Sequence, residues 1–483
     1  MQPTNLLFII SDEHQRNATG CYGNPIVQTP NLDRLAARGV RFTHAYTNCP
    51  ICVPCRASLA TGRYVHEIGH WDNAFPYYGA APAWGRRLQE QGYRVDSIGK
   101  LHYRRAEDDD GFTQKHDAMY VAEGIGELIS CIRDNPPFRK GRGGILKAGP
   151  GESSYLRYDQ RIADQACDWL TDHAGDDKPW VLFTSFVNPH PPFTAPPEFF
   201  ARYPVAEMPL PTAWRQDQWP DHPALDYFRR YFGWEDGFSA AEIRQAVATY
   251  YAMCSYVDHQ IGRVLTVLEE QGLAENTRII YTTDHGAMMG AHGLWGKFTM
   301  YDEAAAIPLL LAGPDLPQGK VVNTPVALVD CFPTILEAVG AQPAPDDVDL
   351  PGESLWAIAQ GTDRERTIFS EYHAAGTQNG IYMVCDGRYK YIHYLHALAQ
   401  FFDLVNDPAE EHNLATSSEH QALVQAYAAQ LRAIVDPAVV DAQAKADQQA
   451  KLEEYGGEAA VLRRGLSNSA IPGEAPVFQQ MTG

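Results

Sequence analysis

The sequence has no apolar run long enough to cross a membrane. It also has far fewer basic than acidic residues. Lys and Arg number 39 against 60 Asp and Glu among 483 residues, so the net charge is −21. This balance argues against nucleic acid or an anionic membrane as a partner. The N-terminus, MQPTNLLFIISDEH, has no basic segment before a short apolar run, which predicts a cytoplasmic location. The nine cysteines, an odd number and mostly scattered, indicate reduced thiols.

Four apolar, β-rich segments each end in a polar, ionisable cluster. The segments are NLLFII, YRVDSI, WVLFTSFV and TRIIYTT, and the clusters are residues 11–14, 99–102, 188–190 and 284–286. Helical patterns alternate with them, at 30–38 and from the capping box at Ser239 to about Gly272. We therefore predict an α/β fold with a large, mostly parallel sheet sandwiched by helices. Ligands bind at the carboxyl ends of such strands, so the clusters should converge.

The composition changes along the chain and predicts three segments. Residues 1–365 would form the α/β domain with the strand-end site, 366–435 a smaller antiparallel sheet plus helix, and 436–483 a helical or extended tail. We expect a homo-oligomer, with the tail either crossing to a neighbouring subunit or forming a solvated extension. Residues 134–154 predict a long loop. The aromatic stretch 203–238 predicts either a pocket wall or lid, or a packed insertion or subunit contact.

Three cysteines, Cys49, Cys52 and Cys55, stand at CxxCxxC spacing in NCPICVPCRASLATGRY. A zinc or iron–sulfur site normally needs four ligands, and no second CxxC follows. A thioredoxin-like pair would begin a helix in a small βαβ domain, which this context does not match. A redox or metal-cluster protein remains an alternative, which a colourless, iron-free preparation would oppose.

Read from Cys52, the same stretch resembles the sulfatase signature C-x-P-x-R-x-x-x-x-T-G. Other blocks also resemble this family in its order: TPNLDRLAARG, GKLH, NPHPPF, TTDHGAMMGAHGLWGKFTMYDE and FFDLVNDPAEEHNLA. The resemblance covers roughly residues 4–416 and points to arylsulfatase- and choline-sulfatase-like members of the alkaline phosphatase superfamily. It implies that a formylglycine-generating maturation enzyme oxidises Cys52 to Cα-formylglycine, whose hydrate is the nucleophile. Cys49 and Cys55 would then be bystanders.

The resemblance also implies one divalent cation. Its expected ligands are Asp12, Glu13, Asp284, His285 and the formylglycine oxygen at position 52. Hard oxygen ligands favour a hard cation, and Ca2+ is the usual metal of the family. Asp-His replaces the more usual Asp-Asn at 284–285, and an imidazole ligand also suits Mn2+.

Six further residues occupy positions that in the family handle the substrate or its protons: Arg56, Asn73, Lys100, His102, His190 and Lys297. We expect Cys52 to lie just before a short helix that starts near Arg56, so that the helix N-terminus faces the developing anion. Arg56 would hold the formylglycine hydrate, and Lys100 and Lys297 would clamp the sulfate oxygens. His102 would be the base that regenerates the aldehyde. His190 would protonate or hydrogen-bond the leaving oxygen. Asn73 would be a further donor to the substrate.

Together these residues predict hydrolysis of a small-molecule sulfate monoester by S–O cleavage. The nearest alternative is a phosphonate monoester or phosphodiester hydrolase, which shares the fold and the formylglycine. The Asp284-His285 pair and the overall pattern favour this alternative. Lys100-x-His102 favours the sulfatase, because those relatives carry neutral hydroxyl side chains there. An aryl sulfate, choline sulfate and a sulfated sugar all remain open as the substrate, since aromatic residues could enclose a quaternary ammonium or stack on a ring.

Overall fold

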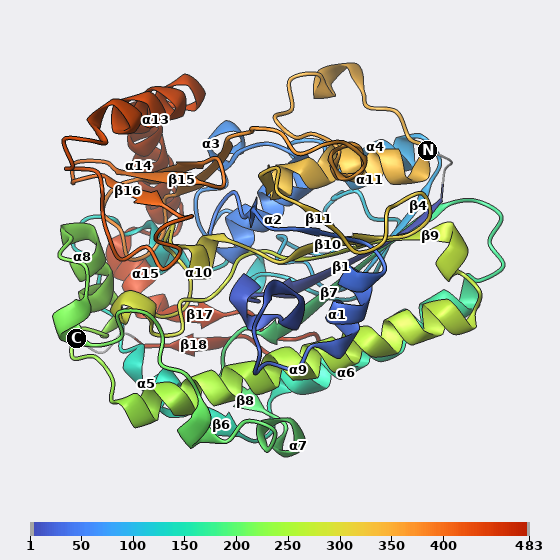
Figure 1. Ribbon diagram of the computed structural model, residues 1–483, viewed down its shortest axis with the longest axis horizontal. Helices are drawn as coiled ribbons and strands as arrows, with labels where there is room; N and C mark the ends of the chain where they lie inside the picture. Colours follow the sequence, from blue (N-terminus) through green and yellow to red (C-terminus); the bar gives the residue numbers. More distant parts are fainter. Residues whose placement is uncertain (1–3, 481–483) are drawn as a thin grey trace.

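An eight-stranded sheet runs through the middle of the molecule (Figure 1). The structure is a computed structural model that describes residues 4–480. The strand order is β11-β2-β10-β9-β1-β7-β4-β5. The five strands from β9 to β5 are parallel: β9 (Thr277–Thr283), β1 (Asn5–Asp12), β7 (Trp180–Pro189), β4 (Arg94–Lys100) and β5 (Gln114–Met119). Beyond β9, the antiparallel β10 (Leu309–Ala312) is followed by β2 (Val40–Phe42) and β11 (Lys320–Val322). The prediction of a mostly parallel sheet is confirmed.

Helices cover both faces of this sheet. Successive side chains of a strand point to opposite faces, so in β1 Leu6 and Phe8 join one apolar cluster while Leu7 and Ile9 join another. The first layer contains α2 (Cys52–Thr61), α4 (Trp84–Glu90), α11 (Cys331–Val339) and α12 (Leu355–Gln360). The second contains α1 (Pro30–Ala37), α6 (Ser154–Asp172) and the long α9 (Ala240–Glu270), seen along one side of the sheet in Figure 1. Burial on both faces explains the uninterrupted apolar strands.

The starts of α9 and α2 can be compared with the starts predicted from the sequence. Ser239 caps α9 as predicted: its hydroxyl accepts from the Glu242 amide while the Glu242 carboxylate accepts from the Ser239 amide. The helix expected near Arg56 instead begins at Cys52, because Ile51 is extended and its carbonyl already accepts from the Cys55 amide at 3.1 Å. Pro54 is tolerated there, since N–H groups of a first turn have no partner within the helix.

Two segments differ in part from expectation. The stretch 134–154 is not loop throughout, since it contains α5 (Arg142–Leu146) and β6 (Gly149–Pro150), which pairs with β8 (Thr194–Ala195). The aromatic stretch includes α8 (Pro223–Phe232), and its rings Phe228, Tyr231, Phe232 and Trp234 are buried in the core. This burial favours the packed-insertion interpretation. Shorter connecting elements are β3 (Ala45–Tyr46), α3 (Val65–Ile68), α7 (Pro197–Phe200), α10 (Asp302–Ala305) and β12 (Val326–Ala327).

A separate antiparallel sheet follows the α/β part, as predicted. It contains β13 (Ile368–Tyr372), β14 (Ile381–Cys385), β15 (Tyr389–Tyr394) and β16 (Gln400–Asp403), with α13 (Gln421–Ile434) packed on it. The tail then forms α14 (Pro437–Glu454), α15 (Glu458–Arg464), β17 (Leu466–Asn468) and β18 (Val477–Gln479). The division into three units stays a prediction.

The tail packs on its own chain. Gln448 of α14 accepts from Arg133 at 3.0 Å and donates to Asp72 at 2.6 Å, and Asp447 accepts from the Trp71 indole at 2.8 Å. Among residues 4–480, no helix is both long and apolar enough to cross a membrane.

Candidate active site

The polar clusters that follow the strands meet at one edge of the sheet. Asp12 is the last residue of β1, Lys100 is the last of β4, and Asp284 directly follows β9. All three side chains are buried. Parallel strands end at a common edge, so residues separated by more than 270 positions become neighbours there.

Cys52 lies at the centre of this edge, at the N-terminus of α2. Its Sγ is 3.1 Å from Lys297 Nζ, 3.3 Å from His285 Nε2 and 3.7 Å from Asp12 Oδ1. Burial, reinforced by the Asp12 charge, raises the pKa of the Cys52 thiol to about 12. The thiol is therefore a poor nucleophile as it stands, because the thiolate is the reactive form.

Arg56, one turn along α2, joins two carboxylates. Its Nε donates to Asp284 Oδ2 at 3.0 Å and its Nη2 donates to Asp12 Oδ2 at 3.3 Å. Lys100 Nζ also contacts Asp12 Oδ2. Burial alone would raise the pKa of Asp12, but the surrounding positive groups, Lys100 first, hold it well below its usual range. Asp12 thus stays an anion without contact with water.

The donor atoms at this edge fit a divalent cation. Ligand atoms of Asp12, Cys52, Asp284 and His285 all lie within 4.8 Å of one another. His285 Nδ1 lies 3.0 Å from the Gly286 carbonyl, which can only accept, so Nδ1 carries the proton and the Nε2 lone pair faces the cluster. That arrangement is the usual outer contact of a metal-binding histidine.

Glu13 supplies a second carboxylate beside this group. Its Oε2 accepts from Lys297 at 3.0 Å, whereas Oε1 is buried with no hydrogen-bond partner among the described residues. Burial raises the pKa of Glu13 above its ordinary value. A buried oxygen without a partner costs free energy, and a cation beside Asp12 would supply the missing contact.

Two histidines at the same edge have ring nitrogens that make no hydrogen bond within the described part of the chain. Both ring nitrogens of His102 are buried without a partner in the described part of the chain, and its φ is +55°. His190 Nδ1 donates to the Pro191 carbonyl at 2.7 Å, which leaves Nε2 3.8 Å from Glu13 Oε2. Burial lowers the pKa of both histidines well below the ordinary value. Both are therefore neutral bases in this structure.

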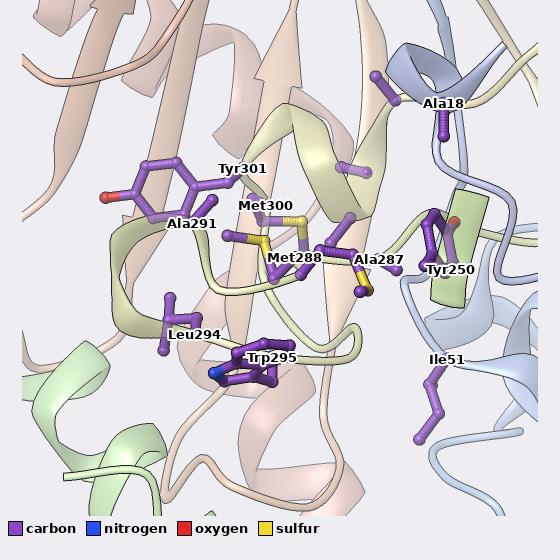
Figure 2. Close-up of a cluster of buried hydrophobic side chains, with 14 of the residues drawn as sticks. Ala18, Ile51, Tyr250, Ala287, Met288, Ala291, Leu294, Trp295, Met300 and Tyr301 are labelled. Atoms are coloured by element: carbon purple, nitrogen blue, oxygen red, sulfur yellow. The ribbon is translucent and has the colours of Figure 1, made fainter. Parts of the chain in front are cut away.

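Lys297 and Asn73 come from loops that packing holds in place. Met288, Leu294, Trp295 and Met300 fill a buried cluster around the loop that carries Lys297 (Figure 2). Asn73 Oδ1 accepts from the Val53 amide in the first turn of α2 at 3.3 Å, and its carbonyl accepts from the Glu127 amide. All the residues predicted for the site are thus brought to one edge.

A pocket of about 160 Å3 opens over Cys52. Its lining includes the predicted Cys52, Asn73, His102, His190 and Lys297, and further residues that sequence patterns missed: Ile51, Val53, Val121, Gly126, Glu127, Arg139, Tyr155, Phe298, Ala375, Ser467, Asn468 and Ser469. The aromatic rings of 203–238 are absent from this lining. Two of them lie directly behind lining residues: Phe232 stacks on Phe298 with ring centroids 4.7 Å apart, and the Tyr231 hydroxyl accepts from Arg139 at 3.1 Å.

The other two cysteines of the triplet do not join Cys52. Cys55 Sγ donates to the Asp284 carbonyl at 3.0 Å, and Cys49 is buried in the core. All nine cysteines are free thiols, and of the triplet only Cys52 belongs to the metal-ligand group among the described residues. The cysteine-cluster alternative therefore has no support in this part of the chain.

Comparison with known proteins finds two family matches and several similar proteins. Residues 4–341 match the family described as Sulfatase, and residues 290–436 match N-sulphoglucosamine sulphohydrolase, C-terminal. An Escherichia coli K12 protein described as "Uncharacterized sulfatase YidJ" is 32% identical over 435 residues, covering 86% of this chain and 83% of that protein. Choline-sulfatase of Rhizobium meliloti is 28% identical, covering 85% and 82%. Human arylsulfatase K is 29% identical, covering 85% and 78%.

Solved structures share the fold. The phosphonate monoester hydrolase of Agrobacterium radiobacter has a TM-score of 0.73 at 23% identity, covering 99% of this chain and 100% of that one. A 2-O GAG sulfatase has a TM-score of 0.68 at 23% identity, covering 93% and 94%. Fold and relatives together define a sulfuric ester hydrolase of the alkaline phosphatase superfamily. The chain belongs to the sulfatase family.

Proposed function

We propose that the chain hydrolyses small sulfate monoesters by S–O cleavage, after Cys52 has been converted to Cα-formylglycine. The observation that carries the proposal is the position of Cys52. Its side chain starts a buried helix and faces Asp12, His285 and Lys297 within 3.7 Å, yet its thiol is held in the unreactive neutral form. Oxidation to an aldehyde removes that obstacle, and a formylglycine-generating enzyme is the partner that this step needs.

The metal ligands in this proposal are Asp12, Glu13, Asp284, His285 and position 52. Formylglycine hydrate supplies hydroxyl oxygens for cation binding and for attack on sulfur, and the cation supplies positive charge that favours the ionised oxygen. The mixed oxygen and imidazole donor set suits Ca2+ first and Mn2+ second. Arg56 orients Asp12 and Asp284 through its two hydrogen bonds.

The substrate's sulfate group would lie between Lys100 and Lys297. Both ammonium groups are buried, so their charges act strongly on oxygens that become more negative as the S–O bond breaks. His190 Nδ1 already donates its proton to the Pro191 carbonyl. His190 would therefore protonate the leaving oxygen from Nε2 only in its doubly protonated form, which the negative charge of a bound sulfate ester would favour. His102, with both nitrogens unengaged, would accept the proton released when the aldehyde is regenerated. Asn73 would donate to the substrate through Nδ2.

A direct test compares matched esters on protein that has been co-expressed with a maturation enzyme. Peptide mass analysis should find formylglycine at position 52, and phenyl sulfate should have a higher kcat/KM than a phenyl phosphonate monoester. A preference for the phosphonate ester would instead support the hydrolase alternative. Full sulfatase activity with an unmodified Cys52 thiol would contradict the mechanism. The cytoplasmic location and the homo-oligomeric state stay predictions.

A further inference from the structure

The chain's own C-terminal tail supplies one wall of the pocket over Cys52. Ser467, Asn468 and Ser469 line this pocket. They lie beyond both family matches, which end at residues 341 and 436. In Figure 1 β17, which carries Ser467 and Asn468, and its antiparallel partner β18 lie side by side (red). We call residues 465–474 the C-terminal strap.

Specific contacts hold the strap against the pocket. Ser467 Oγ donates to the Gly126 carbonyl at 2.9 Å, and the Tyr155 hydroxyl donates to the Ser469 carbonyl at 3.2 Å. Further along, Ile471 is 3% exposed and packs in the core cluster of α6 and α9. At the other end, Arg464 pairs with Glu123 at 3.0 Å. The strap is therefore a fixed wall and not a loose end.

The strap is also linked to the group proposed to protonate the leaving oxygen. The Tyr155 ring meets the His190 ring edge-on, with centroids 6.0 Å apart. Tyr155 thus contacts His190 with its ring and the strap with its hydroxyl. The strap consequently borders the side of the pocket on which the alcohol part of an ester would lie.

The pocket over Cys52 is open to solvent on one side, and its volume is small. The pocket measures about 160 Å3, well below the roughly 300–1,000 Å3 of sites for drug-sized ligands. Part of this volume must take the sulfate group beside Lys297. What remains suits an alcohol part of about one ring.

We propose that the C-terminal strap is the specificity-determining wall of the site and limits it to sulfate esters whose alcohol part is no larger than a single ring. This inference rests on the proposed function, since it assumes that the ester's sulfate lies at Cys52. Opening the wall should admit a second ring. The cost of excluding that ring comes from overlap with fixed atoms of the strap, so it should fall when strap side chains are shortened or released.

The test uses the full-length matured enzyme and two esters, phenyl sulfate and biphenyl-4-yl sulfate, whose phenols have similar acidity. Asn468→Ala shortens a lining side chain, and Ser467→Ala releases the strap from Gly126. In each variant, the phenyl-to-biphenyl ratio of kcat/KM should fall by about fivefold or more relative to wild type. Val477→Ala is the matched control, because Val477 lies in the same hairpin, is 65% exposed and lies outside the pocket lining. Its ratio should stay at the wild-type value.

An unchanged ratio in both variants, with thermal unfolding showing that at least one of them folds, would overturn the proposal. So would a wild-type enzyme that hydrolyses both esters equally well. A second measurement separates this result from failure of the proposed function. Dissociation constants for the two esters on Cys52→Ala protein need no turnover, and they should show the same preference for the single ring. If wild type shows no turnover while Cys52→Ala protein binds the phenyl ester more tightly, the proposed chemistry is contradicted and the role of the strap in size selection is supported. Equal affinity, or no binding of either ester, would overturn the strap proposal itself.

Discussion

The strand-end side of the site and the C-terminal strap are built differently. On the strand-end side, Asp12, Lys100 and Asp284 lie at the ends of strands that are buried on both faces, and Arg56 donates to both carboxylates. The strap lies near the C-terminus and is held by a few hydrogen bonds and the packing of Ile471. Reacting groups need positions fixed within fractions of an ångström, which rigid elements provide. A peripheral segment can change the pocket's size without disturbing them.

Removal of the Cys52 side chain should have the largest effect on activity, because Cys52 belongs to the strand-end side of the site. We expect Cys52→Ala to lower kcat/KM for phenyl sulfate by about 10^4-fold or more, because loss of a nucleophile removes the catalytic set as a unit. Thermal unfolding should change little. Cys49→Ser is the control in the same loop, and its activity should stay near wild type. Retention of activity in Cys52→Ala would contradict the assignment of the nucleophile.

Loss of Arg56 should destabilise the strand-end side itself. Arg56→Ala leaves Asp12 and Asp284 buried without a shared partner, and removing one member of a buried charged set costs about 3–5 kcal/mol. Denaturant unfolding measures this loss. Arg63→Ala is the matched control two residues beyond α2: its pair with Asp349 is solvent-exposed, so the cost should be at most about 1 kcal/mol. Equal costs for the two variants would show that the cluster does not depend on Arg56.

Cation binding should stabilise the folded protein through the same cluster. Chelator-treated protein should gain about 2.7 kcal/mol when Ca2+ or Mn2+ is present at 100 times its dissociation constant, seen as a rise in Tm. Asp284→Asn should lose most of that rise, whereas Asp349→Asn, an exposed acid, should keep it. A full rise in Asp284→Asn would mean that the cation binds elsewhere.

A smaller, pH-dependent effect should appear where the tail meets the pocket. Burial raises the pKa of Asp72 to about 6, and its Oδ2 accepts from Gln448 of α14. The folded carboxyl holds its proton to higher pH than the unfolded chain, so its contribution to stability is complete below about pH 4 and is lost as pH rises through 6. Asp72→Asn should therefore reduce the loss of stability between pH 5 and 8 by about 1.4 kcal/mol.

Unfolding curves at the two pH values measure this contribution. Asp109→Asn, whose side chain is exposed, should keep the wild-type pH dependence. An identical pH dependence in wild type and Asp72→Asn would contradict the assignment. The same measurement shows whether stability depends on pH where the tail contacts the loop of Asn73.

Local patterns predicted much of the fold correctly. The four apolar strands, the capping box at Ser239 and the antiparallel C-terminal sheet all lie where expected. The start of α2 was wrong by four residues, because Ile51 and Cys55 already form the first helical hydrogen bond. A motif identifies residues, but it does not state which of them begins the turn.

Local patterns could not predict which side chains of the aromatic stretch 203–238 are buried, or where the C-terminal tail packs. Whether Phe232 faces a ligand or the core depends on Phe298, and the position of Ser467 depends on Gly126, 341 residues earlier in the chain. Contacts of this kind form only when distant segments pack together, and neither partner carries a local signal of the other.

By itself, the sequence determined which residue types stand at the strand ends of this sulfatase. Period and composition define the buried strands, parallel strands share one carboxyl edge, and the residue types there limit the chemistry. Only the tertiary structure decided which oxygen of Glu13 lacks a partner, which nitrogen of His285 faces the cluster, and that residues 467–469 return to line the pocket. The physical reason is that side-chain orientation and long-range closure are set by packing between segments, which no local pattern records.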